Sequence, residues 1–181
     1  MAEITGTSDH DILEGTSSAD TIVGGAGNDT ITAGAGNDTV VGGLGKDTIN
    51  LGDGDDILVI SKDDLVDNTE FYGDWRYSQI KDVIDGGDGT DTIGFDDNDT
   101  NYDITRATIS NVETLNLRYS TTAYNSGLKV ALTTDQLVGF TTVDSLPGYT
   151  HGIYTGYEPS IQPSYLSYSY ATFKPLLYAV V

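Results

Sequence analysis

Aliphatic residues recur at every ninth position between residues 24 and 59, separated by polar residues and glycine. Ile31, Val40, Ile49 and Leu58 keep this spacing without a slip, and each follows a threonine or another β-branched or polar residue. A single aliphatic residue between outward polar neighbours is typical of a short strand that turns one side chain inward. A fixed period of this length also indicates a repeat architecture, in which each unit buries its apolar face on the next. The pattern therefore predicts a stack of short strands.

The segments between these strands are rich in glycine. The four units read GGAGNDTIT, AGAGNDTVV, GGLGKDTIN and LGDGDDILV. Glycine accepts positive φ angles, so the chain can reverse tightly at these positions. The glycines that we expect to line the turns are Gly24, Gly25, Gly27, Gly34, Gly36, Gly42, Gly43, Gly45, Gly52 and Gly54.

One aspartate ends the turn of every unit. Asp29, Asp38, Asp47 and Asp56 are nine residues apart. If two units complete one coil, aspartates eighteen residues apart stack about 4.8 Å from each other. At an effective dielectric constant near 20, such carboxylates repel by roughly 3 kcal/mol a pair. Ca²⁺, which takes six to eight oxygen ligands, would reverse this repulsion, and turn carbonyls would supply the remaining oxygens. We therefore predict calcium sites between stacked turns.

Degenerate units flank this array. Residues 6–14 and 15–23 keep Asp11 and Asp20 in register but lack the inner glycines, which is typical of a terminal cap. Residues 60–76 interrupt the pattern, and the array resumes over residues 77–94. The additional predicted metal ligands or turn residues from these units are Asp11, Asp20, Asp82, Gly87, Gly89 and Asp91.

The units resemble the GGxGxD nonapeptide of the hemolysin-type calcium-binding (RTX) repeats. The resemblance implies a parallel β-roll with two units per coil and Ca²⁺ between neighbouring turns on each side. It implies an all-β fold, in which this roll is followed by a small β-rich region.

The charge is unevenly distributed along the chain. Residues 1–103 hold 24 acidic and 4 basic side chains, whereas residues 104–181 hold 4 of each. We expect a roll over residues 1–103, with residues 60–76 as an insertion and residues 95–103 as a loop that leaves the roll. So acidic a surface disfavours nucleic acid and anionic lipid as partners.

Residues 104–143 have the character of strands with one short helix. Ile109, Val112, Leu115 and Leu117 alternate in part, and Thr133 with Gln136 forms a potential capping box before a helix of one or two turns. A strand is expected over residues 141–143. The segments ISNVETLNL and VALTTDQLVGFTTV resemble the β-rich region that follows RTX repeats in bacterial surface-layer and other large exported proteins.

Residues 144–181 form a tail rich in tyrosine and proline. It holds all four prolines and seven of the twelve tyrosines. RTX proteins usually leave the cell through a one-step, type I exporter that reads an uncleaved C-terminal signal, and the terminal LLYAVV is compatible with one. The longest aliphatic runs are far too short for a membrane span.

Catalytic motifs are missing from the sequence. It has no HExxH and no GxSxG, it has no cysteine, and its two histidines are 141 residues apart. We expect no enzymatic activity.

Three functions fit these features. The first is a secreted calcium-binding structural or surface-layer-like protein, extracellular or on the cell surface, with a type I exporter and cell-surface or self-assembly contacts as partners. The second is a calcium-triggered folding and export module of a larger RTX exoenzyme. The third is an ice-binding roll, because Thr21, Thr30, Thr39 and Thr48 are predicted to point outward, two on each sheet.

Overall fold

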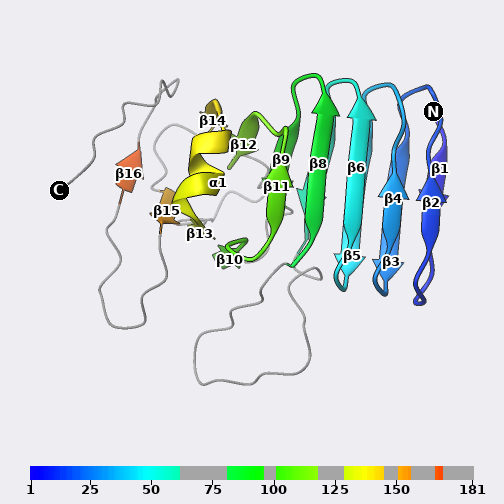
Figure 1. Ribbon diagram of the computed structural model, residues 1–181, viewed down its shortest axis with the longest axis horizontal. Coiled ribbons are helices and arrows are strands. Elements are labelled where there is room, and N and C mark those ends of the chain that lie inside the picture. The colour runs from blue at the N-terminus through cyan, green and yellow to red at the C-terminus, as the bar shows by residue number, and fades with distance from the viewer. Residues whose placement is uncertain (62–80, 96–100, 118–128, 145–150, 156–165, 169–181) are drawn as a thin grey trace, which may run out of the picture.

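Two parallel sheets face each other and are joined by turns at both ends (Figure 1). The computed structural model describes residues 1–61, 81–95, 101–117, 129–144, 151–155 and 166–168. The first sheet has seven strands in the spatial order β1 (Glu3–Thr5), β3 (Thr21–Ala26), β5 (Thr39–Leu44), β7 (Ile57–Ile60), β9 (Thr92–Phe95), β12 (Thr114–Asn116) and β14 (Thr142–Asp144). The second has five, in the order β11 (Thr108–Ser110), β8 (Val83–Asp88), β6 (Thr48–Asp53), β4 (Thr30–Thr32) and β2 (Ile12–Glu14).

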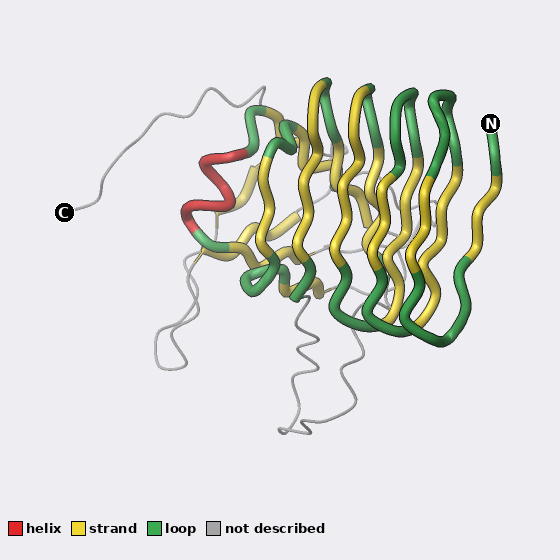
Figure 2. Tube along the Cα trace, turned by 45° about the vertical axis from the view of Figure 1, so that its right-hand side comes forward, coloured by secondary structure: helices red, strands yellow, loops and turns green. Residues whose placement is uncertain are grey.

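Each coil of the roll contributes one strand to each sheet. Ile22 lies opposite Val40 in the first sheet, and Leu13 lies opposite Ile31 in the second, so that partners are eighteen residues apart. All of these pairings are parallel. The predicted parallel β-roll with two nine-residue units per coil is therefore confirmed. The coils stack as regular loops from the N-terminus onward (Figure 2).

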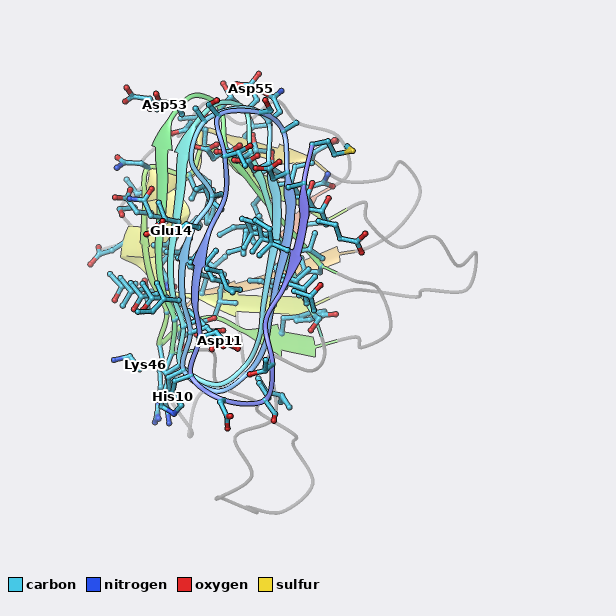
Figure 3. All side chains as sticks on the ribbon, turned by 90° about the vertical axis from the view of Figure 1, so that its right-hand side faces the viewer. His10, Asp11, Glu14, Lys46, Asp53 and Asp55 are labelled. Carbon is cyan, nitrogen blue, oxygen red and sulfur yellow. The ribbon has the colours of Figure 1, made fainter. Side chains whose placement is uncertain are left out.

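The space between the two sheets is filled by the periodic aliphatic residues. Ile22, Ile31, Val40, Ile49 and Leu58 are between 0% and 2% exposed. All five belong to one hydrophobic core. Viewed along the stack, the coils form an oval that encloses side chains between the two sheets (Figure 3). A coil therefore buries one aliphatic residue from each unit, as the nine-residue spacing predicts.

The ladder continues across the interruption in the repeats. Ile49 lies opposite Ile84 and Leu58 lies opposite Ile93, each pair being 35 residues apart. This separation exceeds the regular one of eighteen by 17 residues, the length of the predicted insertion. Residues 62–80, which contain most of that insertion, lie outside the described residues.

Both sheets also continue beyond residue 103, where the charge changes. Strand β11 pairs with β8, β12 pairs with β9, and β14 pairs with β12. Val112, Leu115 and Leu117 belong to the same apolar core as the repeats, and the three are no more than 4% exposed. The composition shift therefore does not coincide with an end of the sheets or of the core.

A third sheet lies beside this end of the roll and has the order β10 (Asn101–Asp103), β13 (Lys129–Leu132), β15 (His151–Thr155) and β16 (Leu166–Tyr168). Residues 101–103 were expected to be a loop, and that expectation is wrong. Tyr102 is 1% exposed, and its ring centroid lies 4.6 Å from that of Phe95. Burial of this ring fixes the segment as a strand despite its acidic surroundings.

The short helix forms where the sequence predicts it. Helix α1 (Thr134–Gly139) begins after Thr133, whose hydroxyl accepts the Gln136 amide while the Gln136 side chain accepts the Thr133 amide. The expected strand after it is β14. In the tail after residue 144, only residues 151–155 and 166–168 are described, so the predicted export signal lies outside the described residues.

Threonines form a longer outward row than the sequence predicts. In the seven-stranded sheet the row reads Thr21, Thr39, Ile57, Thr92, Thr114 and Thr142. Ile57 interrupts the row, and each of these threonines is only partly exposed.

Candidate metal centres

The turns between the sheets depend on glycine at two positions of each unit. Gly25 and Gly27 have φ angles of 109° and 118°, and the equivalent glycines of later units are also positive. The next coil passes close by. A methyl group on Gly43 would lie 2.1 Å from the Gly25 carbonyl oxygen, which is closer than any packing permits. Glycine at these positions lets neighbouring turns approach within reach of a shared ligand.

The repeat aspartates form two rows along the roll. Row A (Asp20, Asp38, Asp56 and Asp91) precedes strands of the seven-stranded sheet, and row B (Asp11, Asp29, Asp47 and Asp82) precedes strands of the five-stranded sheet. All except Asp11 are buried. The two rows lie at opposite ends of the oval coil: Asp53 and Asp55 mark the turns of row A in Figure 3, and Asp11 and Lys46 mark those of row B.

One oxygen of each carboxylate holds the stack together. The Asp20 amide donates to Oδ1 of Asp38 at 2.7 Å, and the Asp38 amide donates to Oδ1 of Asp56 at 2.7 Å. The same bond joins Asp29 to Asp47 at 2.8 Å in row B. The sequence predicted only repulsion between stacked carboxylates. These hydrogen bonds to a charged acceptor offset part of that repulsion.

The second oxygen of five aspartates is buried and has no hydrogen-bond partner. These atoms are Oδ2 of Asp29, Asp38, Asp47, Asp56 and Asp91. An unpaired buried carboxylate oxygen is strongly unfavourable, so a group that satisfies it is required.

Backbone carbonyls border the same spaces. A methyl group on Gly24 would lie 2.8 Å from Oδ2 of Asp29 and 2.3 Å from the Gly42 carbonyl oxygen. Both oxygens therefore face one gap, which the missing side chain of glycine leaves open. A set of carboxylate and carbonyl oxygens suits Ca²⁺.

Comparison with protein families agrees with this geometry. The family model of the RTX calcium-binding nonapeptide repeat matches residues 5–40 and 33–59, in four copies. Residues 5–59 are RTX calcium-binding repeats. Searches of curated proteins and of solved structures found no match to the chain.

Burial changes the acidity of the aspartates in rows A and B. Desolvation raises the pKa of Asp47 and of Asp56 from the ordinary 3.8 to about 6, and that of Asp82 to about 7. It also raises the pKa values of Asp38 and Asp91. The folded chain without metal therefore resists charging these groups, which an ion of opposite charge would reverse.

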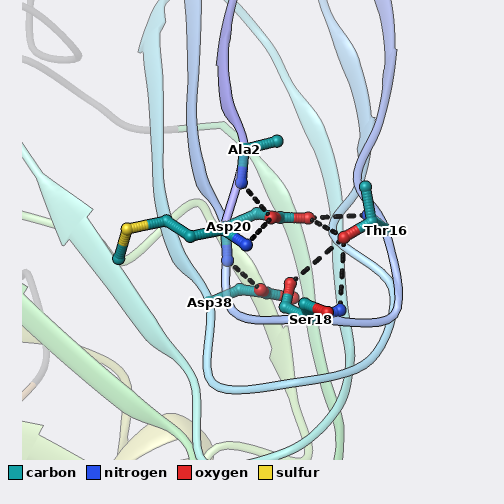
Figure 4. A network of polar contacts seen from close by, with 6 residues as sticks. Ala2, Thr16, Ser18, Asp20 and Asp38 are labelled. Carbon is teal, nitrogen blue, oxygen red and sulfur yellow. Dashed lines mark hydrogen bonds and ion pairs between the residues drawn. The ribbon is translucent and has the colours of Figure 1, made fainter.

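The first two RTX units satisfy their carboxylates differently. Oδ2 of Asp20 accepts both the amide and the hydroxyl of Thr16, each at 2.7 Å (Figure 4). Thr7 bonds Oδ2 of Asp11 in the same way. The Thr16 hydroxyl is the main cause that lowers the pKa of Asp20. The sequence placed Asp11 and Asp20 among the metal ligands, but Oδ2 of each is occupied by protein donors, and Oδ1 of Asp20 also accepts the Ala2 amide.

One acidic residue of row A was missed from the sequence. The Asp91 amide donates to Oε2 of Glu113 at 2.9 Å, so Glu113 takes the position that an aspartate holds in the RTX units. The signal was present, because Glu-Thr-Leu at residues 113–115 matches the Asp-Thr-Ile of the repeats. No group of three His, Cys, Asp or Glu side chains converges on one point among the described residues, so carbonyls must complete each set of ligands.

Proposed function

We propose that this chain is a secreted, calcium-binding structural or surface-layer-like protein whose roll folds when it binds Ca²⁺ outside the cell. The observation that carries the proposal is the set of five buried Oδ2 atoms without partners, repeated along both rows. The RTX match over residues 5–59 supports calcium as the ligand.

The residues that would hold the ion are the aspartates with an unpaired Oδ2 and the carbonyls of the adjacent turns. Asp29 and the Gly42 carbonyl provide one such pair of oxygens. The bound ion supplies positive charge between stacked carboxylates. The protein keeps those carboxylates in line through the amide bonds to Oδ1.

Folding and calcium binding are coupled in this proposal. Each unit contributes one buried aliphatic side chain at the periodic position, few others such as Leu51 and Ile60 add to them, and burial opposes the charge of the aspartates. Extracellular calcium modules bind with dissociation constants of about 10⁻⁴–10⁻³ M. Sites in that range fill outside the cell and stay empty in the cytosol, so that calcium acts as a compartment switch.

The proposed role is structural, and no catalytic activity is part of it. The sequence has two histidines, no cysteine and none of the hydrolase motifs sought above. Among the described residues, no helix is long and apolar enough to cross a membrane. We propose a type I exporter and cell-surface or self-assembly contacts as partners. A reading frame that continues upstream into a catalytic motif would instead favour a folding and export module of a larger exoenzyme.

Calcium titration followed by circular dichroism tests the proposal. We expect the wild type to gain strand signal only with calcium, and Mg²⁺ to be a poor substitute. Asp38→Asn keeps an acceptor for the Asp20 amide but replaces the unpaired Oδ2, so it should bind at least one ion fewer and require more calcium to fold.

Asp135→Asn is the matched control, because Asp135 is exposed on helix α1 and outside both rows. Its calcium midpoint should equal that of the wild type. A wild-type chain that is fully folded in excess chelator, or that takes up no calcium in calorimetry, contradicts the proposal.

A further inference from the structure

A coil without any repeat motif follows the last RTX unit. Thr108 lies opposite Val83, and Thr114 lies opposite Thr92, so that residues 108–116 add one strand to each sheet. The apolar residues Ile109 and Leu115 of this coil are six residues apart, whereas those of successive repeat units, such as Ile31 and Val40, are nine apart. The roll thus ends in a coil of a different sequence on the side of row A.

Asn111 takes the place of a turn residue in this coil. Its φ angle is 52°, and no other residue except glycine has a positive φ angle in the described part of the chain. Its side-chain amide donates to Oδ1 of Asp85 at 2.7 Å, which fixes the turn against the preceding coil. The Asn111 carbonyl oxygen is thereby held beside Gly86.

Gly86 shows the same arrangement that identifies the RTX gaps. A methyl group on Gly86 would lie 1.8 Å from the Asn111 carbonyl oxygen and 2.7 Å from Oδ2 of Asp91. The corresponding distances at Gly24 are 2.3 Å to a carbonyl oxygen and 2.8 Å to Oδ2 of Asp29. At both places a carbonyl and a carboxylate oxygen face the gap left by glycine.

Two carboxylates lie at the seam, which is the contact between residues 86–94 and the coil of residues 108–116. Oδ2 of Asp91 has no partner, and Asp91 is 0% exposed. Glu113 lies next to it, since Oε2 accepts the Asp91 amide at 2.9 Å. Glu113 is only partly buried, so a second carboxylate reaches the edge of the same turn.

We propose that the calcium site of Asp91 takes two ligands from outside the repeats, the Asn111 carbonyl and Glu113, and so joins the last glycine-rich unit, residues 86–94, to the coil that follows it. The site rests on the proposed function, because it takes the same hard cation as the RTX turns. It lies beyond the residues that the repeat family matches. Its consequence is that calcium fixes strands β11 and β12 to the roll, so that the region after the repeats also depends on the metal.

The Glu113→Gln variant tests whether Glu113 binds the ion or only accepts the hydrogen bond from the Asp91 amide. The new amide oxygen can still accept the Asp91 amide, but the variant lacks the negative charge that strengthens a carboxylate's bond to calcium. We expect calorimetry with Ca²⁺ alone to show one fewer ion bound than in the wild type, or one site weakened by about tenfold or more. Glu14→Gln is the matched control, because it makes the same change at an exposed strand position and should bind as the wild type does.

Hydrogen exchange of the wild type provides a readout that needs no variant. Calcium should protect the amides of residues 108–116, and Glu113→Gln should lose that protection while residues 21–44 keep theirs. Equal calcium binding by the Glu113→Gln and Glu14→Gln variants, or exchange at residues 108–116 that calcium does not slow, overturns the seam site. A wild type that binds no calcium anywhere would instead overturn the proposed function.

Discussion

Each repeat aspartate has two oxygens with separate tasks. From Asp29 onward, Oδ1 accepts the amide of the aspartate in the preceding coil and sets the stack, whereas Oδ2 is left for a second partner. In the first two units that partner is a threonine, and glycine stands at the equivalent position in the units of Asp29, Asp38, Asp47, Asp56 and Asp91. The identity of a single turn residue thus decides whether a carboxylate is satisfied by the protein or requires an ion.

Gly42→Ala tests whether the gap beside the carboxylate matters. Gly42 does not need a positive φ angle, but a methyl group there would lie 2.7 Å from Oδ2 of Asp47 and 3.1 Å from Ile49. We expect one calcium site to weaken on the order of tenfold, equivalent to about 1.4 kcal/mol. Gly139→Ala is the control, because nothing lies within 4 Å of that position. Calorimetric traces that coincide for the two variants would refute the role of the gap.

Thr16→Val tests the metal-free satisfaction of Asp20. The variant removes the hydroxyl bonded to Oδ2 but keeps the shape of the side chain and its amide. Loss of one hydrogen bond to a charged acceptor should lower the free energy of unfolding by about 1–2 kcal/mol. The number of calcium ions bound should stay the same. Thr32→Val, on an exposed strand position, should change neither quantity in urea unfolding and calorimetry. A changed stoichiometry would place Asp20 among the calcium ligands.

At the scale of elements, the repeats were predictable because one rule is applied again and again. The nine-residue spacing gave the strands, the two-unit coil and the buried face, and the capping box gave helix α1. The coil at residues 108–116 was not found, because its apolar residues Ile109 and Leu115 are six residues apart instead of nine, its acidic residue is Glu113, and Asn111 replaces glycine. The nine-residue period therefore cannot predict a coil that follows the same backbone path with a different turn sequence.

The satisfaction of the carboxylates could not be predicted from spacing alone. The sequence placed the aspartates in rows, but it could not tell which oxygen accepts an amide. The choice of oxygen depends on the offset between stacked turns, which is visible only in the folded structure. The sequence also grouped Asp11 and Asp20 with the other aspartates, since the contact with Thr7 and Thr16 arises from the local shape of the cap.

The rows of aspartates predict a pH dependence for the roll without metal. Burial raises the pKa of Asp47 and Asp56 to about 6 and that of Asp82 to about 7, so the folded chain binds protons more tightly than the unfolded chain. Their contribution to stability is complete below the ordinary pKa of 3.8 and is lost as the pH rises through 6 to 7. Asp20 has the opposite shift, but it titrates below this window.

Circular dichroism in calcium-free buffer should therefore show strand signal that is present near pH 4 and falls as the pH rises to about 7.5, above which the chain needs calcium to fold. Protons and calcium compete for the same carboxylates, so calcium affinity should rise over that range. Asp47→Asn should flatten the pH dependence. Stability that increases with pH in the absence of calcium would contradict the predicted direction.

At the scale of the whole molecule, charge and structure divide the chain differently. The excess of acidic residues ends near residue 103, yet the seven-stranded sheet runs from β1 to β14 and one apolar core spans the described residues on both sides. The acidic half contains the two rows of repeat aspartates, and the neutral half adds apolar contacts to the same sheets. The charge pattern favours separate unfolding of the two halves when calcium is removed. The shared sheets and core favour joint unfolding instead.

Leu115→Ala tests this coupling at a residue that is no ligand. Leu115 is 0% exposed and lies between Ile93 and Val143 in the seven-stranded sheet. Truncating a buried leucine costs about 2–5 kcal/mol. If this cost is shared among the five ions that the unpaired oxygens suggest, the calcium midpoint of the roll should rise by about two- to fivefold.

Hydrogen exchange at residues 21–44, far along the stack from Leu115, measures that midpoint. Val138→Ala, at a position that is 58% exposed, serves as the control and should leave the midpoint in place. The two halves are coupled only if contacts made after residue 103 stabilise the calcium-bound state of the N-terminal coils. A Leu115→Ala variant that opens residues 108–116 while residues 21–44 fold at the wild-type calcium concentration would show that the two halves are independent, despite their common sheets.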